Sequence, residues 1–139
     1  FLVLLYYFTS TKKRGDTMAW NLNSDRPIFI QIVERIEMDI ISGKYKPGDK
    51  LPSVRDLAAE AAVNPNTMQK AFTELERTGL VFSQRTTGRF ITEDTSMIDE
   101  LKSTLAKDKI TELLSFMQQL GFQENEILAM IGQTMKGEK

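Results

Sequence analysis

The chain has 139 residues, 41% of them hydrophobic, and a net charge of −1, which suits one compact domain with a small appendage. It contains no cysteine and no histidine, so disulfides, thiolate metal sites and the commonest catalytic bases and nucleophiles are excluded. No spacing among the remaining carboxylates, lysines, tyrosines and hydroxyls suggests a catalytic set, a metal site or a cofactor site. The composition therefore argues against an enzyme, and the lack of cysteine fits a reducing cytoplasm.

Residues 1–17, FLVLLYYFTSTKKRGDT, differ in character from the rest of the chain. Their apolar run precedes the basic residues, whereas a secretion signal has the reverse order, and a membrane span needs ~20 apolar residues. We therefore interpret residues 1–17 as a leader that derives from upstream sequence or from cloning. A membrane-proximal tail is the alternative, but no membrane partner is expected.

A first helix is predicted over residues 27–43. Pro27 suits its start and Gly43 its end, and apolar residues recur on one face at Phe29, Ile32, Val33, Ile36 and Ile40. The segment 46–48 predicts a turn, and residues 50–52 predict a short strand-like segment. Trp20, ahead of the helix, is expected to pack on a neighbouring domain or subunit rather than to bind a ligand.

Two short amphipathic helices are predicted between residues 53 and 79. Each has an apolar stripe at helical spacing, formed in the first by Val54, Leu57, Ala58 and Ala61 and in the second by Met68, Ala71, Phe72 and Leu75. Ser53 is the expected N-cap of the first helix, with Asp56 completing a capping box. Asn64 caps the second helix, Pro65 takes its first position, and Gly79 ends it.

The second of these helices presents a polar face opposite its apolar stripe. This face carries amides, hydroxyls and basic side chains, namely Asn66, Thr67, Gln69, Lys70, Thr73 and Arg77. Such groups at a helix N-terminus can bond base edges or phosphates, and the free backbone N–H groups there favour a phosphate oxygen. The predicted arrangement, two helices joined by a tight turn, is therefore typical of DNA-binding proteins. The alternative interpretation is a set of packed helices with a solvated face.

A small β wing is predicted next. Residues 80–83 and 90–92 are expected to form two short strands, joined by a turn of Arg85, Thr86, Thr87, Gly88 and Arg89. Two arginines on a glycine-bearing turn suit contact with the DNA backbone or the minor groove, although a solvated loop would look similar. The expected fold class is mainly α with a small β wing, a winged helix-turn-helix followed by a two-helix C-terminal dimerisation element.

Residues 27–91 resemble the GntR family of transcriptional regulators, through the motifs ISGKYKPGDKLPSVRDLA and VNPNTMQKAFTELERTGL. The resemblance implies a winged helix that binds an operator as a dimer. It also implies that Arg55 contacts DNA from the start of its helix and that Gly88 is the wing glycine. Where the family often has Arg-Gly-x-Gly-Thr in the wing, this chain has RTTGR. The candidate DNA-binding residues are Ser53, Arg55, Asn64, Asn66, Thr67, Lys70, Arg85, Thr87, Gly88 and Arg89.

Two further helices are predicted after Glu93, with a break at Gly121 and the second over residues 124–135. Such short helices cannot bury so broad an apolar surface alone, so we expect them to pair with a second copy of the chain. Packing back on the winged helix is the alternative. A short two-helix C-terminus also marks the YtrA-like subgroup of the GntR family, in which it implies a dimer. The candidate dimerisation residues are Ile98, Leu101, Leu105, Leu113, Met117, Leu120, Ile127 and Ile131.

The predicted domains are the leader (1–17), a winged-helix DNA-binding domain (18–92) and a helical dimerisation region (93–139). Residues 26–92 carry ten Lys and Arg against eight Asp and Glu, a net charge of +2, and residues 93–139 carry five against nine, a net charge of −4. The acidic region is not expected to touch DNA. Affinity must therefore depend on where the basic side chains of the winged helix are placed.

The sequence thus predicts a cytoplasmic transcriptional regulator, expected to be a repressor that binds an inverted-repeat operator in double-stranded DNA as a homodimer. The subgroup resemblance implies control of a transporter operon. A small-molecule effector could bind at Phe116, Met117 and Phe122, although such residues are ordinarily core. The alternative function is a winged-helix adaptor that binds proteins and not DNA.

Overall fold

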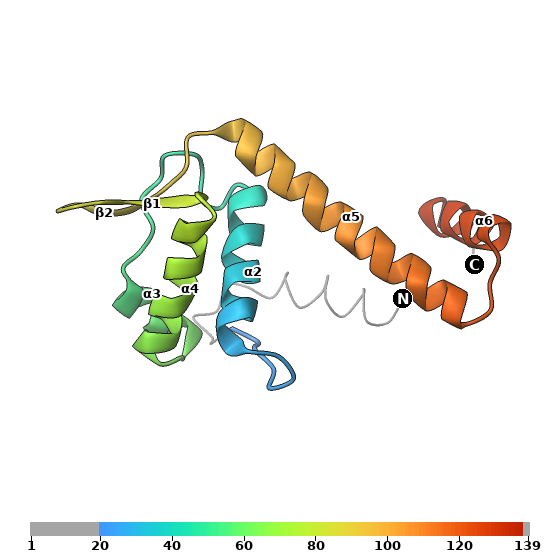
Figure 1. Ribbon diagram of the computed structural model, residues 1–139, viewed down its shortest axis with the longest axis horizontal. Coiled ribbons are helices and arrows are strands. Elements are labelled where there is room, and N and C mark those ends of the chain that lie inside the picture. The colour runs from blue at the N-terminus through green and yellow to red at the C-terminus, as the bar shows by residue number, and fades with distance from the viewer. Residues whose placement is uncertain (1–19, 138–139) are drawn as a thin grey trace. The chain divides into compact units, whose positions relative to one another are not determined.

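The computed structural model describes residues 20–137, so the proposed leader lies outside the described residues. The chain divides into two compact units, one ending at Thr95 and the other beginning at Ser96. The first unit holds α2 (Ile28–Ile41), α3 (Val54–Ala61), α4 (Pro65–Arg77), β1 (Val81–Gln84) and β2 (Gly88–Ile91) (Figure 1). The second consists mainly of α5 (Thr95–Gln119) and α6 (Glu124–Met135). This is the predicted architecture of helices with a small β wing.

The core of the first unit lies where α4 packs against both α2 and α3 (Figure 1). The predicted apolar stripes form this core, and its most deeply buried side chains include Ile32, Ile36, Leu57, Met68, Phe72 and Leu75. Burial of side chains of this size contributes about 1.5–3 kcal/mol each. The packing therefore fixes which face of α4 points outward.

Trp20 is also buried in the structure, with 8% of its surface exposed. Its indole N–H donates to Glu60 Oε2 at 3.2 Å, and the Arg35 guanidinium lies 4.8 Å from the ring centroid. These partners belong to α3 and α2 of the same unit. The expectation that Trp20 packs on a neighbouring domain or subunit was therefore wrong, because side chains of its own unit cover it.

Both helices of the helix-turn-helix begin at the predicted side-chain caps. The Ser53 hydroxyl oxygen accepts the Asp56 N–H at 3.1 Å, and Asn64 Oδ1 accepts the Asn66 N–H at 2.8 Å. Each cap satisfies a backbone donor at the helix start and stabilises the helix by ~1 kcal/mol. Between the helices, Ala62 adopts the left-handed conformation, with φ 58° and ψ 47°. This residue closes the turn at a cost of roughly 1–2 kcal/mol for an L-amino acid.

The wing is an antiparallel hairpin whose strands are shifted by one or two residues from the prediction. Gly88 and Arg89 were expected in the turn, but they belong to β2 because they pair with Gln84 and Ser83. On the other side of β2, the Leu51 N–H donates to the Arg89 carbonyl at 2.8 Å. The predicted strand-like segment thus flanks β2, and the hairpin projects away from the helices of its unit (Figure 1).

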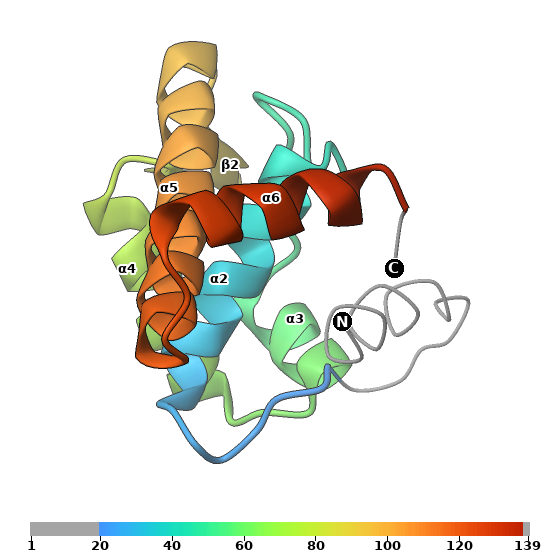
Figure 2. The ribbon, with the colours of Figure 1, turned by 90° about the vertical axis from the view of Figure 1, so that its right-hand side faces the viewer.

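The second unit has the two predicted helices. Gly121, at φ 95°, lies in the left-handed region between them, and α6 begins with a reciprocal capping box between Gln123 and Glu126. Within this unit α6 is turned across α5 (Figure 2). No helix among the described residues is both long and apolar enough to span a membrane.

Candidate nucleic-acid interface

The start of α4 presents polar groups to solvent. Asn66 is exposed in its first turn, and Arg55 is exposed in the first turn of α3. Within the described part of the chain, the Arg55 guanidinium has no hydrogen bond or ion pair. The Asn64 side-chain oxygen accepts the capping hydrogen bond, and its amide NH₂ remains available as a donor. Contrary to the prediction, the first backbone N–H groups of α4 are not free, because they already donate to Asn64.

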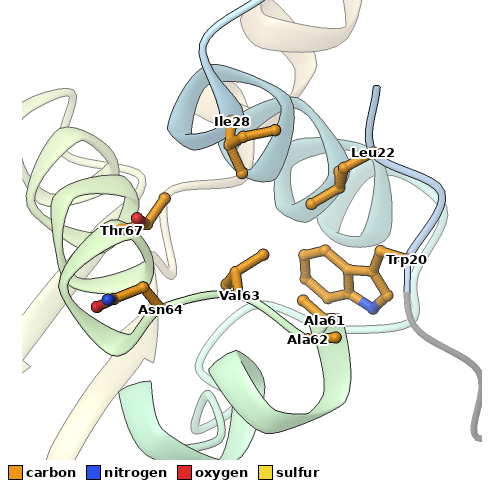
Figure 3. Close-up of a pocket in the computed structure, with 8 residues that line it drawn as sticks. All are labelled: Trp20, Leu22, Ile28, Ala61, Ala62, Val63, Asn64 and Thr67. Carbon is orange, nitrogen blue, oxygen red and sulfur yellow. The ribbon is translucent and has the colours of Figure 1, made fainter. Parts of the chain in front are cut away.

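An open hollow of about 380 Å³ lies beside the start of α4. Figure 3 shows Trp20, Leu22 and Ile28 on one side of it, and the end of α3, the turn and the start of α4 on the other. The Asn64 amide points away from the indole (Figure 3), and Thr67 is half-buried at the rim. The segment before α2 therefore supports the turn from behind, and the polar groups of Asn64 remain outside the apolar lining.

Lys70 is exposed on α4, but its ammonium group is held toward α2. Lys70 Nζ lies 4.1 Å from the centroid of the Phe29 ring, within the range of a cation–π contact. The contact leaves the three N–H donors free of any carboxylate partner in the described residues. Lys70 is thus oriented by Phe29 and still able to bind an anion.

The tip of the wing is fully exposed, and Arg85 lies there without an ion-pair partner among the described residues. The Thr87 hydroxyl donates to Gln84 Oε1 at 3.1 Å, which ties the turn to β1. Gly88 has φ +119°, and a Cβ atom there would lie 2.9 Å from Lys50 Cε. The backbone conformation therefore favours glycine at this position, whereas the flexible end of the Lys50 side chain can move aside.

Arg89 is placed differently from the other predicted contact residues. Its Nε donates to Glu76 Oε1 in the last turn of α4, and its guanidinium lies 5.2 Å from the centroid of the Phe72 ring. Arg77, on the polar face of α4, is bound as well, since its Nη2 lies 2.5 Å from Glu74 Oε1. This hydrogen bond lowers the pKa of Glu74. The spacing of Glu74 and Arg77 on a predicted helix is a sequence signal for their pair, whereas the Arg89–Glu76 pair joins two elements and has no such signal.

The groove between α2 and α4 is negatively charged. It is lined by Phe29, Ile30 and Val33 together with Glu34, Glu37 and Glu74. Burial raises the pKa of Glu37, and the negative charges of Glu34 and Glu74 raise it further. A surface with this charge repels phosphate, so this groove is unsuited to contact with the DNA backbone.

The predicted dimerisation residues fall into three groups in the structure. Leu113 and Leu120 are exposed, whereas Ile98, Leu101, Leu105 and Ile131 are half-buried. Met117 and Ile127 are already buried in the single chain, so direct contact with a second copy is not available to them. Further exposed apolar side chains on the same unit were not among the predicted set, namely Ile110, Leu114, Phe116, Leu128, Met130 and Met135.

Residues 30–91 match the family described as "Bacterial regulatory proteins, gntR family". The chain is 40% identical over 105 residues to the uncharacterized HTH-type transcriptional regulator YhcF of Bacillus subtilis, covering 76% of this chain and 87% of YhcF. It is 41% identical over 97 residues to the HTH-type transcriptional repressor YtrA of the same organism, covering 70% of each.

A solved structure of a GntR family transcriptional regulator from Listeria monocytogenes has the same fold. It superimposes with a TM-score of 0.76 at 39% identity, covering 81% of this chain and 98% of that one. A match over 81% of this chain extends past the wing into the C-terminal helices. The chain therefore belongs to the GntR family, with YtrA and YhcF among its relatives, and it is a DNA-binding transcriptional regulator, not an enzyme.

Proposed function

We propose that this regulator is a homodimeric repressor that binds an inverted-repeat operator. The observation that carries the proposal is the exposed start of α4, where Asn64 caps the helix and presents its amide, with Asn66 in the first turn and the exposed Arg55 on α3. In winged helix-turn-helix proteins the second helix of the motif enters the major groove and reads bases from its N-terminal residues. The repressor assignment is drawn from YtrA, which is named a transcriptional repressor.

The DNA contacts divide into two kinds in this proposal. Arg55 and Lys70 anchor a phosphate or read guanine, and Asn64, Asn66 and Thr67 bond base edges or the adjacent phosphates. Ser53, at the start of α3, adds a hydroxyl donor to the backbone contacts. In the wing, Arg85 binds the backbone or the minor groove, with Thr87 and Gly88 shaping the tip.

The dimer follows from the apolar surface of the second unit. Phe116, Leu120 and Leu128 are each more than half exposed, at 57%, 57% and 63%. Large apolar side chains grouped on one unit mark an interaction surface, and a second copy is the simplest partner. Two copies place two α4 helices about 34 Å apart if the half-sites are separated by one turn of DNA.

The effector and the regulated gene are two further parts of the proposal. Phe116 is exposed whereas Met117 is buried, so these two side chains do not share one enclosed pocket with Phe122. A small-molecule effector would therefore have to bind elsewhere on the protein. We propose that the regulated gene belongs to a transporter operon and that the protein acts in the cytoplasm, where a regulator of chromosomal DNA is needed.

The test is fluorescence anisotropy of the DNA upstream of the protein's own gene beside a shuffled duplex, each at two salt concentrations. Tight binding to the native duplex alone is the expected result. Equal binding to both duplexes with strong salt dependence would contradict recognition of this site by base contacts. If a folded protein binds neither, the adaptor function gains the support that the repressor loses.

A further inference from the structure

Arg89 was predicted to contact DNA, but its charged group is bound inside the first unit. Its Nε donates to Glu76 Oε1, and its guanidinium lies over Phe72. The two charged side chains are only 26% and 32% exposed, so water screens this pair less than it screens a fully exposed one. The pair joins β2 to the last turn of α4.

The direction of the Arg89 side chain follows from the strand. Alternate residues of a strand point to the same face, so Arg89 lies on the face of Ile91, which is fully buried, next to its partner Val81. Arg89 therefore continues the inner face of the hairpin beyond the core. Phe72 and Glu76 are one turn apart on α4 and thus form a continuous docking surface for the Arg89 side chain.

We propose that the Arg89–Glu76 pair is a brace that fixes the wing relative to α4 and thereby places Arg85 on the DNA. Arg89 is then a positioning residue, and Arg85 is the wing's phosphate contact. This inference rests on the proposed operator binding. It assigns different roles to two arginines that the sequence presents as equivalent.

The length of the hairpin explains why a brace matters. Residues 49–51 hydrogen-bond to β2 only as far as Arg89, so the part of the hairpin beyond Arg89 has no third strand beside it among the described residues. Two residues span about 7 Å, so a rotation of ~10° at the level of Arg89 moves the tip by about 1 Å. A displacement of that size breaks a hydrogen bond to phosphate, whose length tolerance is a few tenths of an ångström.

The opposite interpretation is that Arg89 leaves Glu76 and binds DNA directly. The two interpretations predict opposite signs for Glu76→Gln. If Arg89 binds DNA, this change frees the guanidinium and removes a negative charge near phosphate, so binding tightens and becomes more salt-dependent. If the pair is a brace, the same change loosens the wing and binding weakens, although the protein has become less negative.

The experiment compares operator affinity for Glu76→Gln, Arg89→Gln and the double variant. Glu74→Gln is the matched control, since it removes the same charge from the same helix but breaks only the Glu74–Arg77 pair. We expect both single changes to weaken binding about fivefold, and the double change to be no worse than either, because both break one brace. Glu76→Gln binding as tightly as the control, or more tightly, would overturn the proposal.

A second measurement tests, in the absence of DNA, whether the Arg89–Glu76 pair is a brace. The chain contains no cysteine, so Thr86→Cys at the exposed wing tip gives one fluorophore site per chain. Time-resolved anisotropy of the labelled, DNA-free protein should show larger local motion in Glu76→Gln than in the parent or in Glu74→Gln. Equal motion in all three would refute the brace. If the parent protein binds no duplex, that result refutes the proposed operator binding. The measurement of wing motion still tests whether the Arg89–Glu76 pair is a brace.

Discussion

At the scale of single residues, Arg55 is the side chain on which the proposed DNA contact depends most. Its guanidinium is exposed in the first turn of α3 and has no ion-pair partner in residues 20–137. We expect Arg55→Ala to weaken operator binding by about 1–3 kcal/mol, because one charge-assisted contact to a guanine or a phosphate is lost. Anisotropy titration of the folded variant measures this loss.

The matched control for Arg55 is Lys109→Ala on α5, which removes one positive charge from the acidic half of the chain. Lys109 is exposed and paired only with Glu112, three residues along the same helix. We expect this variant to bind operator like the parent. Equal affinities for the Arg55 variant and the control would show that Arg55 makes no contact with DNA.

Gly88 supports the wing through its backbone. Because its φ is +119°, Gly88→Ala places a Cβ atom in a strained backbone conformation, although the end of the Lys50 side chain can move aside. We expect a loss of about 1–3 kcal/mol in the free energy of unfolding, measured by urea denaturation. Thr86→Ala, in the exposed turn, should stay within ~0.5 kcal/mol of the parent. A Gly88 variant as stable as the Thr86 variant would contradict the constraint at this position.

At the scale of elements, negatively charged side chains repel one another in the groove between α2 and α4. Burial raises the pKa of Glu37 above its ordinary 4.5, and so do the charges of Glu34 and Glu74. A raised carboxyl pKa means that the folded state holds its proton to higher pH than the unfolded state does. The ionised Glu37 therefore costs stability above its folded pKa, and this cost disappears below pH 4.5.

The prediction from this groove is that Glu37→Gln stabilises the protein at pH 7. We expect a gain of ~0.2–0.5 kcal/mol, the size of a like-charge pair on a helix. The gain should shrink as the pH falls through the folded pKa of Glu37 and vanish below 4.5. Urea denaturation of both proteins at pH 7 and pH 4 tests this, and a gain that grows toward low pH would have the wrong sign.

The elements that the sequence predicts well are those set by local interactions. Ser53 and Asn64 cap helices through residues two or three positions away, and Gly79 and Gly121 have the positive φ expected of helix ends. Each of these features is visible in a short window of sequence. The bounds of α6, Glu124–Met135, agree with prediction for the same reason.

The features that sequence alone misplaces depend on distant partners. Gly88 and Arg89 were assigned to the turn because the register of a hairpin is decided by pairing across the strands. The contact of Arg89 with Glu76 spans 13 residues, and that of Lys70 with Phe29 joins two helices. Met117 shares the helical spacing of its exposed neighbours, so periodicity could not show that it is buried.

At the scale of the whole molecule, the proposed dimer depends on the exposed apolar side chains of the second unit. Leu120 and Leu128 are exposed on it, and burying each leucine against a partner contributes about 1.5–3 kcal/mol. We expect the double change Leu120→Glu/Leu128→Glu to weaken dimerisation at least about 100-fold. Sedimentation velocity over a concentration series measures the change.

The dimer variants need a control for added charge. Thr111→Glu introduces a carboxylate at an exposed polar position of α5 and should leave the dimer intact. Because Leu120 and Leu128 are exposed, the double variant should keep its helical circular dichroism. A parent protein that sediments as a monomer at all concentrations would contradict the homodimer.

The most direct test of the proposed function is footprinting on the DNA upstream of the protein's own gene, with the parent protein and the Arg55→Ala variant side by side. A homodimer with one α4 in each major groove should protect two half-sites related by a two-fold axis, with centres about 10 base pairs or a multiple of one turn apart. The Arg55 variant should require a higher concentration for the same pattern. Protection of a single unrepeated segment, or of no defined segment by a folded protein that binds the duplex, would contradict operator recognition by a two-fold dimer.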